Sequence, residues 1–569
     1  MEPVVNTKHN LIFIVALLMI FTAGLTVDVM NVDAAQYASM SRDMLFSGRW
    51  LEVQCRHHDY LDKPPLLFWL SALSFKIFSV SNWAYKLPSF LFAILGIYST
   101  YRLAELLYDR RTGSVAALML ASCFGVFIMT NDIRTDTLLL GSVVFSIWQL
   151  LLYLKTKRWP SLVAGFAGIA VAMLAKGPIG LVIPVMALSC EFAYRRQWKN
   201  FFRPEWIAGA IIIAVILFPM SLGLYRQFDL HPEKTVNGST GVSGLKFFYW
   251  TQSFGRITGD SDWGTKYDNG AGPFFFTHTF LWAFFPWSFL VLGGLIKTFI
   301  KLVRSRFREG FVPEVISAGG FTLTFIALSL SKYKLPHYIY VTFPLAAILA
   351  ARFFLYDVFH HMKKYLLVIF TSLHVLFIIA LAAASLLITF FIFPGGHTID
   401  KITVVFWLTA AIVMLLFLKN TYRRILYPLV AALAGFYFTG NAIFYPSLLR
   451  YESSALAGKL VVKNNVPPDD LFTYHDIFEY ALDFYSGRDV EYTSLEDSAF
   501  TNAMSRHGSV WIYTEASALD EISAKFSIDQ KQEFSDYPVQ FLKAEFLDPS
   551  RRESTLRKRY LLVISPKKE

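Results

Sequence analysis

The fold class of the chain is decided by residues 161–194, which read SLVAGFAGIAVAMLAKGPIGLVIPVMALSCEFAY. Two long apolar runs, Ser161–Ala175 and Ile179–Tyr194, are separated only by Lys176-Gly177-Pro178. A membrane-spanning helix needs about 20 mostly apolar residues, and glycine and proline are typical of helix ends. The stretch therefore predicts two spanning helices joined by a tight turn. We interpret Lys176 as structural, because lysine favours a helix C-terminus.

The same pattern recurs along most of the chain. By the criterion of about 20 apolar residues, roughly thirteen segments qualify as spanning helices. A further apolar stretch, Leu66–Val80, is short, and we expect it to be interfacial or re-entrant. The predicted spans are Leu11–Val27, Lys86–Leu107, Gly113–Met129, Thr137–Leu154, Ser161–Ala175, Ile179–Tyr194, Trp206–Tyr225, Pro273–Phe299, Pro313–Leu330, Tyr338–Leu355, Tyr365–Phe393, Ile402–Leu418 and Ile425–Phe444.

Composition supports an all-α polytopic membrane protein. Of the 569 residues, 55% are hydrophobic and 17% are charged, whereas soluble domains carry about 25% charged residues. This excludes a disordered chain and an ordinary cytosolic enzyme. A transmembrane β-barrel is disfavoured because its strands alternate polar and apolar residues, and the apolar runs here are continuous.

Basic residues gather in alternate loops, which explains the net charge of +11 without invoking nucleic acid. The positive-inside rule places these loops in the cytoplasm. An odd number of spans then puts the N-terminus in the cytoplasm and the C-terminus on the outer face. The basic loops carry Arg110 and Arg111; Lys155, Lys157 and Arg158; Arg195, Arg196, Lys199 and Arg203; Lys301, Arg304, Arg306 and Arg308; Lys363 and Lys364; and Lys419, Arg423 and Arg424.

Three regions should lie outside the membrane on the outer face. We divide the chain into a transmembrane domain, residues 1–445, and a polar C-terminal segment, residues 446–569. Short β-like runs alternating with helical patterns predict a small soluble α/β domain for that segment. Within the transmembrane domain, residues 28–65 and 227–272 form two long outward loops, and loops of this length are usually functional.

The first outward loop and a tight outward turn carry candidate reactive side chains. Asp33 either caps a helix, with Gln36 completing a capping box, or offers a rigid carboxylate that takes or orients a proton. Lys63 precedes two prolines that force extended backbone, and it either snorkels toward lipid headgroups or binds a phosphate. In the turn, Asp136 is a helix cap or a second functional carboxylate, and Arg134 has Asp132 and Asp136 as possible partners.

Further candidates lie in later outward segments. Arg256 in the second loop suits bidentate phosphate binding. Residues 331–338 read SKYKLPHY, which suits a site for phosphate and sugar, although interfacial lysine and tyrosine are also common membrane anchors. The chain lacks nucleotide-binding fingerprints such as GxGxxG and GxxxxGK[ST], which argues against a sugar-nucleotide donor and ATP-driven transport. Acidic residues are absent from the middle of the predicted spans, whereas ion-coupled transporters keep ionisable groups near the membrane midplane.

These motifs, taken together, resemble those of a known superfamily. In order they are DAAQY at 33–37, YLDKPPLLFWL at 60–70, RTDTLLL at 134–140, KGPIGL at 176–181 and SKYKLPHY at 331–338. The combination resembles the GT-C glycosyltransferases of the protein O-mannosyltransferase-like superfamily, with most likeness to bacterial 4-amino-4-deoxy-L-arabinose (lipid A) transferases. The resemblance covers most of Asp28–Phe354, and the family's architecture agrees with the number of spans counted from hydropathy.

The resemblance implies a fold, an activity and roles for matched residues. Such enzymes are generally inverting and transfer a sugar from a polyprenyl-phosphate carrier on the periplasmic side of the bacterial inner membrane, to lipid A or another periplasmic acceptor. Asp33 and Asp136 match catalytic carboxylates, and Lys63 matches the lysine that contacts the carrier phosphate. We assign to phosphate binding Lys63, Arg256, Lys332 and Lys334, and to the substrate cavity Tyr37, Tyr60, Asp62, Arg134, His337 and Tyr338.

Three differences from the family pattern leave parts of the function open. Asp62 stands where the family often has glutamate, and Gln36 stands where the aminoarabinose transferases have arginine. Gln252-Ser253 replaces a Glu-His pair whose histidine helps to hold a metal. Cofactor use, including a divalent metal, and the exact sugar therefore stay open. The alternatives are a protein O-glycosyltransferase of the same superfamily and a lipid or glycan transporter.

Overall fold

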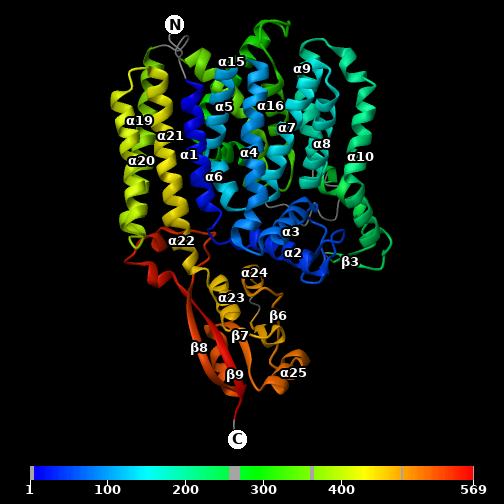
Figure 1. Cartoon of the computed structure of the whole chain (residues 1–569), viewed down its shortest axis with the longest axis vertical. Coiled ribbons are helices and arrows are strands. Elements are labelled where there is room, and N and C mark those ends of the chain that lie inside the picture. The colour runs from blue at the N-terminus through cyan, green and yellow to red at the C-terminus, as the bar shows by residue number, and fades with distance from the viewer. Residues whose placement is uncertain (1–5, 237, 256–269, 359–363, 476–478, 568–569) are drawn as a thin grey trace.

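The computed structural model describes residues 6–567 except 237, 256–269, 359–363 and 476–478. A bundle of long helices forms one part of the molecule, and a small sheet with short helices extends from one end of it (Figure 1). Helix α1 begins at the end of the bundle opposite the C-terminal sheet (Figure 1). The chain is therefore an all-α membrane protein with a small C-terminal α/β unit, as the sequence predicts.

The predicted spanning segments are helical in the described part of the chain. Nine helices or continuous helical runs are long and apolar enough to cross a membrane, and two bent pairs, α5 with α6 and α14 with α15, raise this number to 11. Two predicted spans, α9 and α16, are helices of 16 and 15 residues. The helices of the bundle are α1 (Thr7–Gly24), α4 (Asn82–Leu107), α5 (Arg110–Ser122), α6 (Phe124–Asn131), α7 (Thr135–Thr156), α8 (Trp159–Lys176), α9 (Ile179–Tyr194), α10 (Glu205–Leu224), α14 (Phe275–Ala283), α15 (Ser288–Arg304), α16 (Ile316–Leu330), α17 (Phe343–Phe353), α19 (Lys364–Leu387), α20 (Thr398–Phe417) and α21 (Thr421–Thr439).

Small residues let the central helices approach closely. Gly96 on α4 faces Gly141 on α7, and a Cβ atom added to Gly141 would meet the backbone carbonyl of Phe92. In a membrane, helices associate through such close packing, since lipid is as apolar as their side chains. Most of α7 and nearly all of α17 are buried, whereas α10 and α20 lie at the two edges of the bundle in Figure 1.

The first outward loop forms a compact layer on the end of the bundle that carries the sheet. It contains α2 (Asp33–Ser47) and the short hairpin of β1 (Gln54–Cys55) and β2 (His58–Asp59). The next element, α3 (Leu66–Phe78), is only 13 residues long and lies in the same layer beneath the bundle in Figure 1. The apolar stretch there is thus too short to span, in agreement with the sequence prediction.

The second outward loop lies on the same end of the bundle. Its described part contains β3 (Thr235–Val236), which pairs with β4 (Ser239–Thr240), then α11 (Gly244–Lys246) and a π-helical segment, η3 (Phe247–Gly255). The predicted phosphate ligand Arg256 lies outside the described residues.

The C-terminal unit is built on a five-stranded sheet of order β6-β5-β7-β9-β8. The first three strands are parallel, and β9 and β8 are antiparallel to their neighbours. The strands are β5 (Leu471–Thr473), β6 (Glu491–Tyr492), β7 (Val510–Glu515), β8 (Phe526–Asp536) and β9 (Arg557–Pro566), and the helices are α22 (Tyr445–Leu448), α23 (Ser453–Lys463), α24 (Tyr480–Ser486), α25 (Ser498–His507), α26 (Leu519–Lys525) and α27 (Ala544–Leu547).

Polar contacts join the C-terminal unit to the first outward loop. The Arg56 guanidinium pairs with the buried Asp483 carboxylate at 2.6 Å. The Gln36 amide donates a hydrogen bond to the Tyr480 hydroxyl at 2.8 Å. Gln36 therefore does not complete a capping box for α2, because its side chain bonds to the C-terminal unit.

The stability of the contact between the C-terminal unit and the first outward loop should depend on pH. The backbone N–H of Asn31 donates to Glu452 at 2.8 Å, and its amide donates to Glu479. Burial raises the pKa of Glu452 from 4.5 to about 8 and that of Glu479 from 4.5 to about 7. Between about pH 4.5 and 8 the unfolded chain has lost protons that the folded chain retains, so stability falls as pH rises.

We expect the purified protein to melt about 2–4 °C lower at pH 8.5 than at pH 5.5 because of these two groups. The variant Glu479→Gln should lose part of this drop. The control Glu496→Gln removes a carboxylate that is 87% exposed, so it should keep the drop. Equal pH slopes in the wild type and Glu479→Gln would contradict the assignment.

Candidate functional site

Two carboxylates begin the helices that bring the candidate site together. Asp33 is the first residue of α2, and the preceding residue, Val32, is the N-cap and makes no side-chain capping bond. Asp136 lies in the first turn of α7, where Arg134 is the N-cap, again without a side-chain capping bond. The expectation that these carboxylates cap their helices is therefore wrong: both pair with cations instead.

Arg134 joins the first loop to the turn before α7. Its guanidinium pairs with Asp33 and, through Nε at 2.9 Å, with Asp132. Of the two partners considered from the sequence, Asp132 is confirmed, whereas Asp136 is not the partner. The Asp33 side chain is 36% exposed and that of Arg134 is 25% exposed, so a solvent-accessible carboxylate is held by a fixed positive charge at the membrane edge.

Asp136 is buried, pairs with Lys176 and lies near His337. Its carboxylate forms an ion pair with Lys176 at the end of α8, and its other oxygen lies 3.7 Å from His337 Nε2. Lys176 also lies over the Tyr338 ring, 3.8 Å from the centroid. The interpretation of Lys176 as a purely structural helix end is therefore incomplete. The clue in the sequence was its position in the same outward layer as the other charged motifs.

Lys63 lies in the wall of a cavity beside these groups. Its amino group pairs with Asp62, whose backbone carbonyl accepts a hydrogen bond from the Gln252 amide. Burial alone would lower the pKa of Lys63, but the adjacent Asp62 carboxylate favours the charged form through its charge and its hydrogen bond, and the pKa lies above its ordinary value. Lys63 therefore remains a cation beside the cavity.

Tyr37 is buried and Tyr60 is half-buried, and neither is among the described residues that line the cavity. Tyr37 and Tyr60 both pack against Phe68, with ring centroids 5.7 and 6.2 Å apart from it. Burial raises the pKa of both phenols. They stay protonated and can donate hydrogen bonds to an anion or a sugar.

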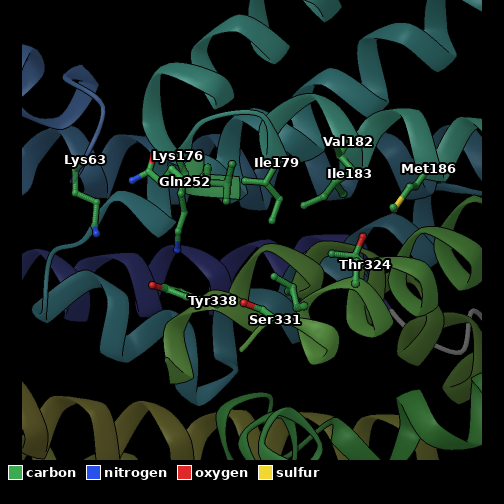
Figure 2. Close-up of a pocket in the computed structure, with 13 residues that line it drawn as sticks. Lys63, Lys176, Ile179, Val182, Ile183, Met186, Gln252, Thr324, Ser331 and Tyr338 are labelled. Atoms are coloured by element: carbon green, nitrogen blue, oxygen red, sulfur yellow. The ribbon is translucent and has the colours of Figure 1, made fainter. Parts of the chain in front are cut away.

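The cavity has a polar end and an apolar end. Figure 2 shows the amino groups of Lys63 and Lys176 near the Tyr338 hydroxyl, while the side chains of Ile183 and Met186 extend along the other part of the cavity. The cavity has a volume of about 140 Å³. A charged end and an apolar end in one cavity suit an amphiphile with a phosphate head. The lining residues are Lys63, Leu139, Lys176, Ile179, Val182, Ile183, Met186, Gln252, Thr324, Ala327, Leu328, Ser331 and Tyr338.

Not every predicted site residue contributes to this cavity. Lys332 is exposed and is absent from the described lining, and the Lys334 amino group donates to the Ala271 carbonyl at 2.9 Å. Asp33 and Asp136 are not among the residues that line the cavity. Asp33 pairs with Arg134. Asp136 pairs with the lining residue Lys176 and lies near His337. The structure thus gathers Asp33, Tyr37, Tyr60, Asp62, Lys63, Arg134, Asp136, His337 and Tyr338 into one region.

A metal does not fit the described residues. No group of three or more histidine, cysteine, aspartate or glutamate side chains among them could hold a metal ion. At the position where the resemblance implies a metal-holding Glu-His pair, the neutral Gln252 amide donates to a backbone carbonyl. We therefore derive the chemistry of this site from Lys63, Lys176 and the carboxylates.

Comparisons with known proteins agree with this architecture. Residues 62–222 match the family described as dolichyl-phosphate-mannose-protein mannosyltransferase. The structure of ArnT from Cupriavidus metallidurans bound to undecaprenyl phosphate superposes over 98% of both chains, with a TM-score of 0.68 and 18% sequence identity. The chain therefore has the same overall fold as that ArnT structure. The resemblance inferred from the motifs is thereby confirmed.

Curated relatives point in the same direction. An undecaprenyl phosphate-alpha-4-amino-4-deoxy-L-arabinose arabinosyl transferase 2 of Proteus mirabilis (strain HI4320) is 26% identical over 314 residues, which is 54% of this chain and 52% of that protein. An uncharacterized protein of Aquifex aeolicus (strain VF5) is 23% identical over 485 residues, which is 83% of this chain and 85% of that protein. The chain spans about half the length of the first curated relatives it matches.

The pair of Lys176 and Asp136 gives a direct test of the geometry. Asp136→Ala leaves the Lys176 ammonium without its buried partner, and breaking such a pair costs about 3–5 kcal/mol. The double variant Asp136→Ala/Lys176→Met removes both charges and should unfold at a higher temperature than Asp136→Ala alone. Thermal unfolding in detergent measures this, and a double variant less stable than the single one would show that the pair is not formed.

Proposed function

We propose that the protein is an integral-membrane glycosyltransferase that moves a sugar from a polyprenyl-phosphate carrier to a lipid acceptor resembling lipid A. The observation that carries this proposal is the cavity with Lys63 and Lys176 at one end and an apolar wall at the other. An isoprenoid chain suits the apolar wall, and its phosphate suits the two ammonium groups. The names of the arabinosyl transferases among its relatives support the same donor.

In the proposed reaction an acceptor oxygen attacks the anomeric carbon as the bond from that carbon to the carrier phosphate breaks. The departing phosphate gains negative charge, which Lys63 and Lys176 stabilise from fixed positions in a partly dehydrated cavity. A hydroxyl acceptor passes its proton to a carboxylate, for which Asp33 is the more accessible candidate. Asp136 orients Lys176 and so acts through it. Attack opposite the leaving group gives inversion at the anomeric carbon.

The proposed location is the bacterial inner membrane. The N-terminus would be cytoplasmic, and the C-terminal unit, residues 446–569, would be periplasmic with residues 28–65 and 227–272. The basic loops support this orientation through the positive-inside rule. Arg256, Lys332 and Lys334 remain predicted phosphate ligands, and Tyr37, Tyr60, Asp62, Arg134, His337 and Tyr338 remain proposed cavity residues.

A second candidate is a protein O-glycosyltransferase. The match of residues 62–222 to the dolichyl-phosphate-mannose-protein mannosyltransferase family favours it. The two functions share a donor class and differ in acceptor.

A transfer assay with purified, reconstituted protein tests the proposal. The protein is given a polyprenyl-phosphate sugar with lipid A or with a secreted protein, and mass spectrometry follows both acceptors. Sugar on lipid A supports the first function, and sugar on the protein supports the second. Movement of the lipid across vesicles without any new glycosidic bond would identify a transporter and overturn both.

A further inference from the structure

A second hollow lies at the end of the bundle opposite the candidate site. It is a groove of about 720 Å³ between α9, α15 and α16, near the end of the bundle where α1 begins in Figure 1. Its walls are almost entirely apolar and include the small residues Ala193, Ala318 and Gly319. Phe299 and Thr322 lie on its exposed rim. Such a groove on the lipid-facing side of a membrane protein is shaped to take an acyl chain.

A cluster of cations lies at the mouth of this groove. A smaller hollow lined by Lys301, Arg304, Arg306 and Arg308 shares Ile300 with the groove. None of these four side chains forms an ion pair with another residue in the described part of the chain. The apolar and the basic hollow are thus one continuous surface, which we call the α15–α16 groove.

Nearby acidic residues have other partners. Glu309 lies 3.6 Å from Arg195, and Asp357 pairs with Lys297. Glu314 accepts hydrogen bonds from Tyr108 and Ser317. The cations at the groove mouth therefore form no ion pair with these carboxylates, and their positive charge attracts an anion at a membrane surface.

The loop that carries two of these cations is fixed in position. The Tyr194 hydroxyl donates to the Arg308 carbonyl at 3.1 Å and accepts from the Val312 N–H at 3.0 Å. The Val315 N–H donates to the Glu191 carboxylate at 2.8 Å. Because α9 holds the loop at several points, Arg306 and Arg308 are placed beside the groove before any ligand arrives, which reduces the entropy lost on binding.

We propose that the α15–α16 groove binds one anionic glycerophospholipid of the surrounding membrane. Its acyl chain would lie between α9, α15 and α16, and its phosphate would contact Lys301, Arg304, Arg306 and Arg308. Charge complementarity favours this occupant over a zwitterionic lipid. The exposed Phe307 and Phe311, at 56% and 59%, lie among the cations, as aromatic residues do at membrane surfaces. This proposal does not depend on the transferase reaction.

Native mass spectrometry of the detergent-purified protein, titrated with phosphatidylglycerol or phosphatidylcholine, tests the proposal. We expect one phosphatidylglycerol to bind at least about tenfold more tightly than phosphatidylcholine, which corresponds to about 1.4 kcal/mol. The variant Arg304→Gln/Arg306→Gln should lose this preference. The variant Thr322→Trp fills the groove and should weaken the binding of both lipids.

Matched controls separate the groove from general charge and hydrophobicity. Arg196→Gln/Lys199→Gln removes two exposed cations elsewhere on the same end of the bundle and should keep the preference. Ile207→Trp adds the same ring to the lipid-facing side of α10, where the residue is 67% exposed, and should keep lipid binding. Equal affinity for the two lipids, equal losses in test and control variants, or a second copy of the chain in place of lipid would each overturn the proposal.

Discussion

Replacing Lys63 with alanine is expected to lower sugar transfer by about a hundredfold to a thousandfold, because preorganised charge at a developing anion contributes that much to a rate. Lys63 lines the cavity and is only 16% exposed. Pro64 and Pro65 follow it and restrict its backbone. The Lys63 ammonium is already positioned to stabilise the departing phosphate, so the solvent does not have to reorganise.

The effect should fall on the chemical step rather than on folding. Lys63→Ala removes one partner of a partly exposed ion pair with Asp62, which is 34% exposed, so the cost in stability should be about 1 kcal/mol or less. Single-turnover assays with saturating donor measure the rate, and melting temperature reports folding. Lys63→Arg should recover part of the rate, because it restores charge with a different shape.

Lys76→Ala is a suitable control for this variant. Lys76 lies in the last turn of α3, thirteen positions along the chain from Lys63. It is exposed and is not part of the cavity lining in the described structure. Its loss should leave transfer within about twofold of the wild type, as for an ordinary surface residue. If Lys63→Ala transfers sugar as fast as Lys76→Ala, Lys63 does not stabilise the departing phosphate.

The fold could be predicted from the sequence because its signals are local. Each spanning helix is a continuous apolar run, and the hydropathy of residues 161–194 already defines α8, the turn and α9. Helix bends were missed, since the break between α5 and α6 at Cys123 and that between α14 and α15 leave the apolar pattern intact. Those bends depend on packing with other helices, which one segment's hydropathy does not report.

Partners at the site were harder to predict, because they are set by tertiary contacts. The motifs identified Asp33, Lys63 and Asp136 as candidates. They did not show that Arg134 pairs with Asp33 or that Lys176 pairs with Asp136. Both pairs join segments at least 40 positions apart in the sequence. Gln36 and Tyr480 of the C-terminal unit are farther apart still in the sequence, and no local sequence pattern predicts their contact.

The size of the effect of Asp33→Asn should show whether the acceptor group is a hydroxyl or a phosphate. A hydroxyl must lose a proton as it attacks the sugar, and a positioned general base contributes about a hundredfold to ten-thousandfold. A phosphate acceptor is already ionised and needs orientation only. We therefore expect Asp33→Asn to reduce transfer to a hydroxyl at least about a hundredfold, and transfer to a phosphate by about tenfold or less, as for one lost charge-assisted contact.

Asparagine is a close test of the carboxylate because it keeps the shape and one acceptor oxygen. The contact with Arg134 can persist as a neutral hydrogen bond, so α2 should keep its place. Asp43→Asn is the matched control: this carboxylate lies on the same helix and also pairs with an arginine, Arg42, next to the C-terminal unit. Transfer to a hydroxyl acceptor at the wild-type rate in Asp33→Asn would exclude Asp33 as the base.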